Sequence, residues 1–363
     1  MELRHGRKWS GRRSMLVGAA AASVGMLGVA CSAAKAGQTS AGPCKPATTP
    51  VITFAAYSTP REVYGKIIPA FQALWKTEHN QSVIFEESYG GSTTQAQNVV
   101  NGFPADVVAL SLAPDVKSIQ DAGLITHDWT KAPDKGMVST SVVVFDVRPG
   151  NPKHIANWND LTQSGLQILT PDPAASGGAR WNIVGAYGAS TRGKVSGYAA
   201  GSDADAGKLL QGIFKNVTVL DKSARDSIKN FESGNGDVAI TYENEVLTAQ
   251  KAGLPDQMVI PPSTVLIQNP VAVVDKNAEG HCVENVANAF VAYLHTADAE
   301  ALYTSVGFLR PTDAAAARAG DGDKFPAITD LFTTDDLGGW GSVGTKVFGT
   351  NGVFTNAFKA AQG

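Results

Sequence analysis

The chain has 363 residues, of which 43% are hydrophobic and 17% are charged, and its formal net charge is −3. This composition predicts a soluble globular protein with one large domain or two medium ones. Because basic residues are not in excess, we expect no nucleic-acid partner.

Residues 1–30 are predicted to be a signal peptide. Five basic residues precede an uncharged, mostly apolar run over residues 15–30, which is shorter than the roughly 20 residues that span a bilayer. The pair Arg12-Arg13 resembles a twin-arginine export signal, and the Sec route is the alternative. Either route predicts export from the cytoplasm.

The apolar run ends at Gly28-Val29-Ala30-Cys31, which resembles the lipobox of bacterial lipoproteins. In a lipobox the cysteine is lipidated and becomes the mature N-terminus. The usual Leu stands three residues before the cysteine, whereas Leu27 stands four before it. We expect lipid attachment at Cys31, with ordinary cleavage as the alternative. Residues 31–50 are rich in Ser, Ala and Gly and are predicted to be a flexible tether.

A disulfide is expected from the cysteine count. The chain has three cysteines, and lipidation of Cys31 leaves Cys44 and Cys282. Because export places them in an oxidising compartment, we expect these two to pair.

A strand, a short polar turn and a helix recur along the mature chain, with strands expected at 51–57, 82–89, 166–170 and 217–221. This alternation predicts an α/β fold with mostly parallel sheets. The units are too many for one compact sheet, so we expect two lobes: residues 51–138 with about 247–363, and about 139–246. The β-branched run at 138–147 is expected to cross between them, and similar runs follow at 236–245 and 269–276.

Four of these turns begin helices at the carboxyl ends of strands. Thr59, Ser92 and Ser223 fit capping boxes, and Ser176 fits an N-cap. The carboxyl edge of such a sheet forms the ligand crevice, and helix N-termini present free N–H groups with partial positive charge. The pattern predicts an anion site, with ordinary capping as the alternative.

Seven segments occur in one order: AAYSTPREVY, SYGGSTTQA, PADVVALSLAPDV, LTPDPAASGGARWN, KNVTVLDKSAR, GNGDVAITYENE and VAVVDK. Together they resemble the sulfate-binding proteins of bacterial ABC importers, extracytoplasmic lipoproteins of the sulfate/thiosulfate family. The resemblance continues to FLRP and GGW and covers nearly all of the mature chain. It implies the type II periplasmic-binding-protein fold, in which two α/β lobes joined by hinge strands close on one anion.

The resemblance also implies the residues of the site. The sulfate donors would be the N–H groups of Ser58, Ser92, Gly177, Gly178 and Ala224, the Ser176 hydroxyl, and the side chain at position 242. Gly91, Arg180 and Arg225 would lie beside them. We expect the two arginines to brace the turn peptides, with Asp221, Asp226 and Glu243 as their partners, and surface charge is the alternative.

Position 242 departs from the family pattern. A tryptophan indole N–H is the family's last donor, whereas this chain has Tyr242. An indole N–H can only donate, but a phenolic hydroxyl can donate or accept. The choice between sulfate and thiosulfate or molybdate therefore stays open at this residue.

The resemblance implies a monomeric protein that binds sulfate at the outer face of the cytoplasmic membrane and delivers it to permease subunits. No cofactor, metal or catalytic residue is expected. The alternatives are thiosulfate, molybdate, tungstate or phosphate as the ligand, a structural surface protein, or a serine hydrolase. A G-x-S-x-G elbow around Ser176 would need glycine where Ala174 stands, the histidines show no triad pattern, and no H-E-x-x-H or paired C-x-x-C motif occurs.

Overall fold

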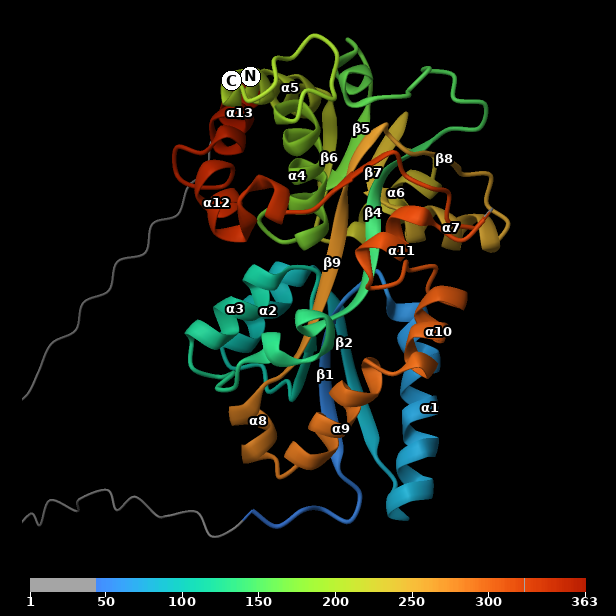
Figure 1. Cartoon of the computed structure of the whole chain (residues 1–363), viewed down its shortest axis with the longest axis vertical. Helices are drawn as coiled ribbons and strands as arrows, with labels where there is room; N and C mark the ends of the chain where they lie inside the picture. Colours follow the sequence, from blue (N-terminus) through green and yellow to red (C-terminus); the bar gives the residue numbers. More distant parts are fainter. Residues whose placement is uncertain (1–43, 323) are drawn as a thin grey trace, which may run out of the picture. The chain divides into compact units, whose positions relative to one another are not determined.

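Strands run through the middle of the molecule with helices on both sides (Figure 1). The computed structural model describes residues 44–322 and 324–363, so the predicted signal peptide, Cys31 and most of the predicted tether lie outside the described residues. The strands are β1 (Val51–Tyr57), β2 (Ile84–Gly90), β3 (Val107–Ala109), β4 (Met137–Val147), β5 (Ile168–Pro171), β6 (Val217–Asp221), β7 (Val238–Tyr242), β8 (Gln257–Val259), β9 (Ser263–Val273) and β10 (Asp330–Phe332).

The α-helices lie between these strands and after them. They are α1 (Arg61–His79), α2 (Ser92–Val100), α3 (Ala113–Asp121), α4 (Gly177–Thr191), α5 (Asp203–Lys215), α6 (Ala224–Glu232), α7 (Glu243–Lys251), α8 (Asp275–Gly280), α9 (Glu284–Leu294), α10 (Ala297–Ser305), α11 (Ala314–Ala319), α12 (Gly339–Lys346) and α13 (Val353–Gln362). Short 3₁₀ helices are η1 (Trp129–Lys131), η2 (Pro133–Gly136), η3 (Trp158–Thr162) and η4 (Asp335–Leu337).

The sheet order in the described residues is β2-β1-β3-β9-β4-β7-β5-β6, with β10 on β9 and β8 on β4. Strand β1 is parallel to β2 and β3, and β5 is parallel to β6 and β7. We call β1–β3 with α1–α3 and α8–α10 the first half, and β5–β8 and β10 with α4–α7 and α11–α13 the second half.

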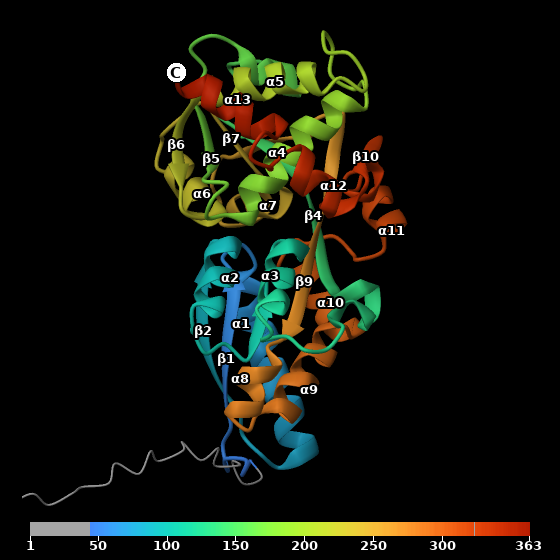
Figure 2. The same cartoon turned by 90° about the vertical axis from the view of Figure 1, so that its left-hand side faces the viewer.

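Strands β4 and β9 run through both halves (Figure 2). Residues 137–142 of β4 pair with β9, and residues 143–147 pair with β7. The run at 138–147 therefore crosses between the halves as expected. The run at 236–245 does not cross, because β7 lies within the second half and α7 begins at Glu243.

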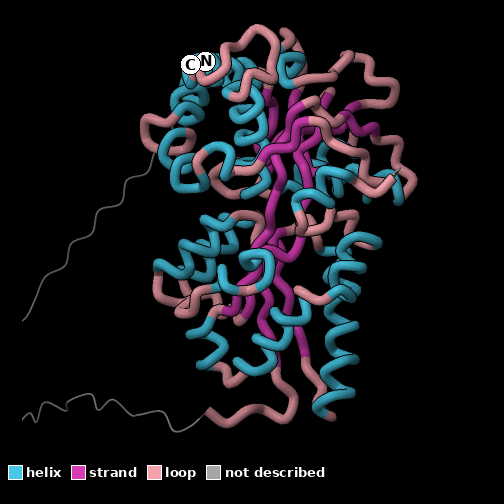
Figure 3. Tube along the Cα trace, viewed as in Figure 1, coloured by secondary structure: helices cyan, strands magenta, loops and turns pink. Residues whose placement is uncertain are grey.

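Helices cover both faces of the sheet (Figure 3), and successive side chains of a strand point to opposite faces. In β1, Ile52, Phe54 and Ala56 pack in one hydrophobic cluster with α1 and α9, whereas Ala55 packs on the opposite face with α2 and α3. Parallel sheets are usually buried on both faces in this way. The mixed α/β class predicted from the sequence is confirmed.

The C-terminal helices α12 and α13 belong to the second half. Val343, Val347 and Phe354 share a hydrophobic cluster with α4 and α5, and the ring centroids of Phe214 and Phe354 lie 5.0 Å apart. Strand β8 lies there too, since it pairs with residues 145–147 of β4, which also pair with β7, and helix α7 directly follows β7. This differs from the expectation that residues 247–363 belong to the first lobe, because an amphipathic pattern indicates that a helix is covered but not by which partner.

The expected disulfide between Cys44 and Cys282 is present. It joins the segment before β1 to the turn between α8 and α9, with the two Cα atoms 5.4 Å apart, within the usual range for a disulfide. Within the described ranges, no helix combines the length and the apolar character that a membrane crossing requires.

Candidate functional site

One cavity lies where the two halves meet, at the carboxyl ends of β1, β2 and β7 and the starts of α2, α4 and α6. It is small, with about 10 Å³ open to the centre of a water-sized molecule. Its lining residues are Tyr57, Ser58, Thr59, Gly90, Gly91, Ser92, Ser111, Ser176, Gly178, Ala224 and Tyr242. All of the expected anion-binding residues except Gly177 are among them. Gly177 is adjacent, since a Cβ there would lie 2.8 Å from Ser111 Oγ.

Three helices begin at this cavity, with Gly91, Ser176 and Ser223 as their N-caps. The first N–H groups of a helix have no partner within the helix and carry partial positive charge. The cavity therefore collects hydrogen-bond donors from both halves. Its lining includes no arginine or lysine in the part of the chain that the structure describes.

The hydroxyl of Ser176 makes no capping hydrogen bond to its own helix. In contrast, Ser223 Oγ accepts from the N–H of Asp226 at 3.1 Å, which is the N-cap half of the predicted capping box, and it donates to the Asp226 carboxylate at 2.8 Å. The Ser176 hydroxyl is therefore available to a ligand in the cavity, whereas the Ser223 hydroxyl caps the helix that follows it.

The capping boxes expected at Thr59 and Ser92 are not formed. The N-cap of α1 is Pro60 and the N-cap of α2 is Gly91, and neither has a side-chain cap. Ser92 Oγ instead donates to Asp115 Oδ2 at 2.6 Å. Ser92 therefore offers the cavity its backbone N–H rather than its hydroxyl.

The expected backbone donor at Ser58 is already engaged. Its N–H donates to the carbonyl of Gly90 at 3.0 Å, continuing the pairing of β1 with β2. Ser58 lines the cavity, so what it offers an anion is its hydroxyl. The expectation of a free Ser58 N–H does not hold, because the neighbouring parallel strand β2 accepts this hydrogen bond.

The buried carboxylate of Asp115 does not line the cavity but accepts a hydrogen bond from Ser92, which does. Besides Ser92, Thr93 Oγ1 donates to it at 3.2 Å. Burial raises the pKa of Asp115, while the hydrogen bond from Ser92 and the positive charge of Arg180 act against this rise. Asp115 fixes the first turn of α2 through these two hydroxyls. It lies in the segment PADVVALSLAPDV but was not among the expected site residues.

Tyr242 lies at the end of β7 with its hydroxyl 2.7 Å from Ser111 Oγ. Burial raises the pKa of Tyr242 well above the ordinary value for tyrosine, so it carries its proton at neutral pH. Ser111 was not among the expected residues. It lies just after β3, and its closeness to Tyr242 depends on contacts between residues 131 positions apart.

Arg225 holds a turn of the opposite half. Its Nη2 donates to the carbonyl of Thr59 at 2.9 Å and to Glu62 at 2.9 Å, and its Nε lies 2.8 Å from Glu245 Oε2. Partial burial acts to raise the pKa of Glu62, but the hydrogen bonds and charge of Arg225 outweigh this and lower it.

Arg180 holds the turn before α4. Its Nε donates to the carbonyl of Pro173 at 3.0 Å, and its guanidinium lies over the ring of Phe348. The acidic partners differ from those expected: Glu245 and Glu62 serve Arg225, while Glu243 pairs with Arg310.

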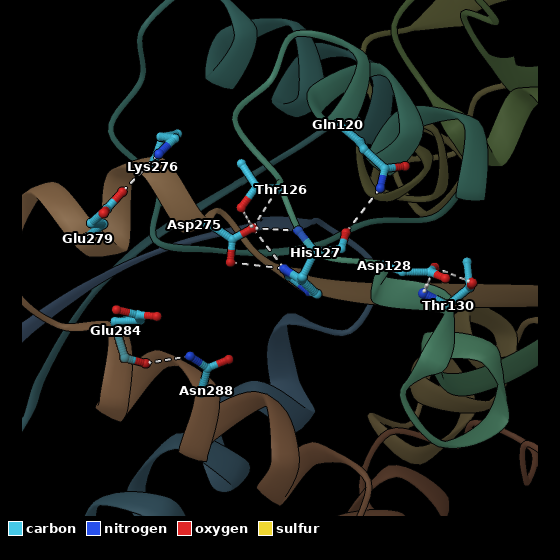
Figure 4. Close-up of polar contacts among 10 residues, drawn as sticks. All are labelled: Gln120, Thr126, His127, Asp128, Thr130, Asp275, Lys276, Glu279, Glu284 and Asn288. Carbon is cyan, nitrogen blue, oxygen red and sulfur yellow. Dashed lines mark hydrogen bonds and ion pairs between the residues drawn. The ribbon is translucent and has the colours of Figure 1, made fainter.

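A histidine–aspartate pair exists outside the cavity (Figure 4). His127 Nδ1 lies 2.8 Å from Asp275 Oδ2, and Asp275 also accepts from the hydroxyl of Thr126 at 3.1 Å. Because Thr126 bonds to the carboxylate and not to the imidazole, the arrangement is not a nucleophile–base pair. It ties the loop after α3 to the start of α8. Within residues 44–322 and 324–363, no cluster of metal-ligating side chains is found.

The fold and the site define a class: a two-lobed solute-binding protein of type II, with an anion-type cavity between its halves. Comparison with known proteins agrees. The model of the family described as bacterial extracellular solute-binding protein matches residues 52–309, and the chain belongs to this family.

Its relatives confirm the resemblance to sulfate-binding proteins. The chain is 39% identical to a sulfate-binding protein of Synechococcus elongatus, over 97% of this chain and 98% of that one. It is 40% identical to a sulfate-binding protein of Salmonella typhimurium, over 84% of this chain and 92% of that one. The solved structure of the sulfate-binding protein SubI from Mycobacterium tuberculosis H37Rv matches with a TM-score of 0.72 and 37% identity, over 82% of this chain and 99% of that one.

Proposed function

We propose that this protein binds sulfate in the cavity between its two halves and delivers it to the transmembrane subunits of an ABC permease. The observation that carries the proposal is the meeting of three helix starts at one cavity lined by Ser92, Ser176 and Ala224. The named ligand of the relatives supports sulfate as the particular anion.

The chemistry of the lining suits a dianion. The N–H groups of Ser92, Gly177, Gly178 and Ala224 and the hydroxyl of Ser176 supply donors from fixed helix starts. Donors that are already oriented stabilise a negative charge without reorganisation, as in an oxyanion hole. Arg180 and Arg225 do not line the cavity. They fix the turns beside it by donating to the carbonyls of Pro173 and Thr59.

The same lining favours sulfate over phosphate. Sulfate carries no proton at neutral pH, whereas hydrogen phosphate carries one that needs an acceptor. The N–H groups of the lining cannot accept, which leaves only its hydroxyls as partners for that proton. Where no hydroxyl is placed to accept it, the unpartnered polar group costs about 1–3 kcal/mol, which is roughly a 5- to 150-fold loss of affinity. Thiosulfate, molybdate and tungstate remain the alternative ligands of the same donors.

Delivery rests on the contacts between the halves. The bond from Thr94 N–H to the carbonyl of Ala175 and the Arg225–Glu62 pair both join the two halves at the site. Closure around the anion would form these contacts and create the shape that the permease recognises. We assign no catalytic step to the protein, and we propose that it acts as a monomer held at the outer face of the cytoplasmic membrane by lipid on Cys31.

Calorimetric titration of the lipid-free mature chain with sulfate, thiosulfate, molybdate, tungstate and phosphate tests the proposal. We expect one sulfate per chain, bound more tightly than the other four anions. A hundredfold excess of sulfate over Kd should also raise the stability of the fold by about 2.7 kcal/mol. Phosphate as the tightest ligand would overturn the selectivity argument, and no binding of any of the five would overturn the function.

A further inference from the structure

Ser111 and Tyr242 approach the cavity from opposite halves of the molecule. Ser111 lies between β3 and α3, Tyr242 ends β7, and both side chains are 1% exposed. Their hydroxyl oxygens are 2.7 Å apart, and either can be the donor. Both residues line the cavity.

The backbone of Ser111 is fixed from both sides. Its N–H donates to Ser92 Oγ at 2.9 Å, and its carbonyl accepts from Trp181 Nε1 at 2.8 Å. Ser111 Oγ lies beside the first residue of α4, since a Cβ at Gly177 would come within 2.8 Å of it. The hydroxyl oxygen of Ser111 is therefore held next to the free N–H groups at the start of α4, and only the hydroxyl hydrogen can rotate.

The pair has two hydrogens, and one of them occupies the bond between the oxygens. A phenol is a stronger acid than an aliphatic alcohol and is therefore the better donor in such a pair. When Tyr242 donates to Ser111, the hydrogen of Ser111 is free to point into the cavity. Each hydrogen bond in such a chain polarises the next one, so the donation from Tyr242 strengthens Ser111 as a donor.

We propose that Ser111 contacts the bound sulfate directly and that Tyr242 is a positioning residue that acts through Ser111. This inference rests on the proposed function. It moves the contact from position 242, where the resemblance placed it, to Ser111, which was not among the expected site residues. Because the two hydroxyls belong to opposite halves, the relay is complete only when the halves are in contact.

A double-mutant cycle on sulfate affinity in the mature chain tests the relay. We expect Ser111→Ala to weaken binding about 10- to 100-fold, as for loss of a hydrogen bond to a charged group. Tyr242→Phe should weaken it less, and the double variant should bind as Ser111→Ala does, because Tyr242 has no contact left to act through. Ser190→Ala, which removes another buried serine hydroxyl on α4, is the control and should leave binding unchanged.

A second measurement does not depend on deleting either side chain. Replacing Tyr242 with mono- and difluorinated tyrosine makes the phenol a stronger donor with little change of shape. Sulfate affinity should rise with the acidity of the phenol while it stays protonated, which a purely structural role would not produce. This measurement also stands if Ser111→Ala fails to fold.

The outcomes separate the two proposals. If wild type binds sulfate but the losses from Ser111→Ala and Tyr242→Phe add, or Tyr242→Phe costs more, the relay is wrong and the proposed function stands. An affinity that falls or stays constant on fluorination also refutes the relay. If wild type binds no sulfate, the proposed function itself has failed.

Discussion

The backbone N–H of Thr94 donates to the carbonyl of Ala175 at 3.1 Å, which joins the first turn of α2 to the residue before the N-cap of α4. The two residues belong to opposite halves. Gly91 lies under this contact: a Cβ there would come within 2.5 Å of Ala175 O and 2.6 Å of Lys222 O. Its φ of −65° suits any residue, so glycine is required here for space and not for backbone conformation.

We therefore predict that Gly91→Ala prevents the close approach of the halves while leaving each half folded. Overpacking of this kind costs about 1–3 kcal/mol, so sulfate affinity should fall roughly 5- to 150-fold, with little change in the Tm of the sulfate-free protein. Gly65→Ala on α1 is the control, because a Cβ there meets nothing within 4 Å. Calorimetry showing wild-type affinity for Gly91→Ala would contradict the role of this contact.

The ion pair between Arg225 and Glu62 should stabilise the form in which the halves touch. Glu62→Gln leaves Arg225 its contacts with Thr59 and Glu245, so the fold should keep its stability. Because the Glu62 side chain is 45% exposed, the effect should be small, about a two- to fivefold loss of sulfate affinity at low salt. Glu78→Gln, on the same helix and more exposed, should have no effect; equal losses in both variants would point to net charge instead.

Ser176 and Ser223 both stand at N-caps but should respond differently to alanine. Ser223 caps α6, so Ser223→Ala should lower the free energy of unfolding by about 1 kcal/mol. Ser176 makes no cap bond, so Ser176→Ala should leave stability near wild type and weaken sulfate binding about 10- to 100-fold. Urea unfolding and calorimetry on the two variants separate the effects. A Ser176→Ala variant that loses stability but not affinity would make this residue an ordinary cap.

Asp146 on β4 should make the fold less stable as pH rises from about 4 to about 8. Its side chain is fully buried, and both carboxylate oxygens are without a hydrogen-bond partner among the described residues. Burial raises the pKa of Asp146 to about 8, helped by the charges of Asp256 and Glu232 and opposed by Arg148. In the unfolded chain the pKa returns to about 3.9.

The sign of the effect follows from proton binding. The folded state holds the proton where the unfolded state has lost it, so the stabilisation is complete below about pH 4 and is lost as pH rises through about 8. Asp146→Asn should remove this slope and unfold at higher urea than wild type at alkaline pH. Asp121→Asn, at an exposed position, is the control. Parallel pH profiles for wild type and Asp146→Asn would show that Asp146 does not titrate in this range.

Patterns in adjacent residues correctly predicted the elements that depend on local sequence alone. Strands β1 and β6 have the expected bounds, because an apolar run followed by a polar turn and a helix is readable from adjacent residues. The helix starts at Ser176 and Ser223 were likewise visible. The resemblance then supplied residues that the structure brings to one cavity.

The failures share one cause, which is competition from distant partners. The Ser58 N–H was taken by Gly90, and the Ser92 hydroxyl by Asp115. Ser111 lies against Tyr242, 131 positions further along the chain, so its contact at the cavity could not be read from adjacent residues. A pattern in sequence shows what a group can do, but the neighbour that folding provides decides which of its hydrogen bonds form.

Diffraction from crystals of the mature protein grown with selenate tests the central claim most directly. Selenate has the charge and shape of sulfate, and its selenium gives an anomalous signal that locates it. We expect one strong peak per chain inside the cavity, within hydrogen-bonding distance of Ser92, Ser176 and Ala224, and its loss when sulfate is added in excess. A peak elsewhere on the protein, or an empty cavity at saturating selenate, would contradict the account.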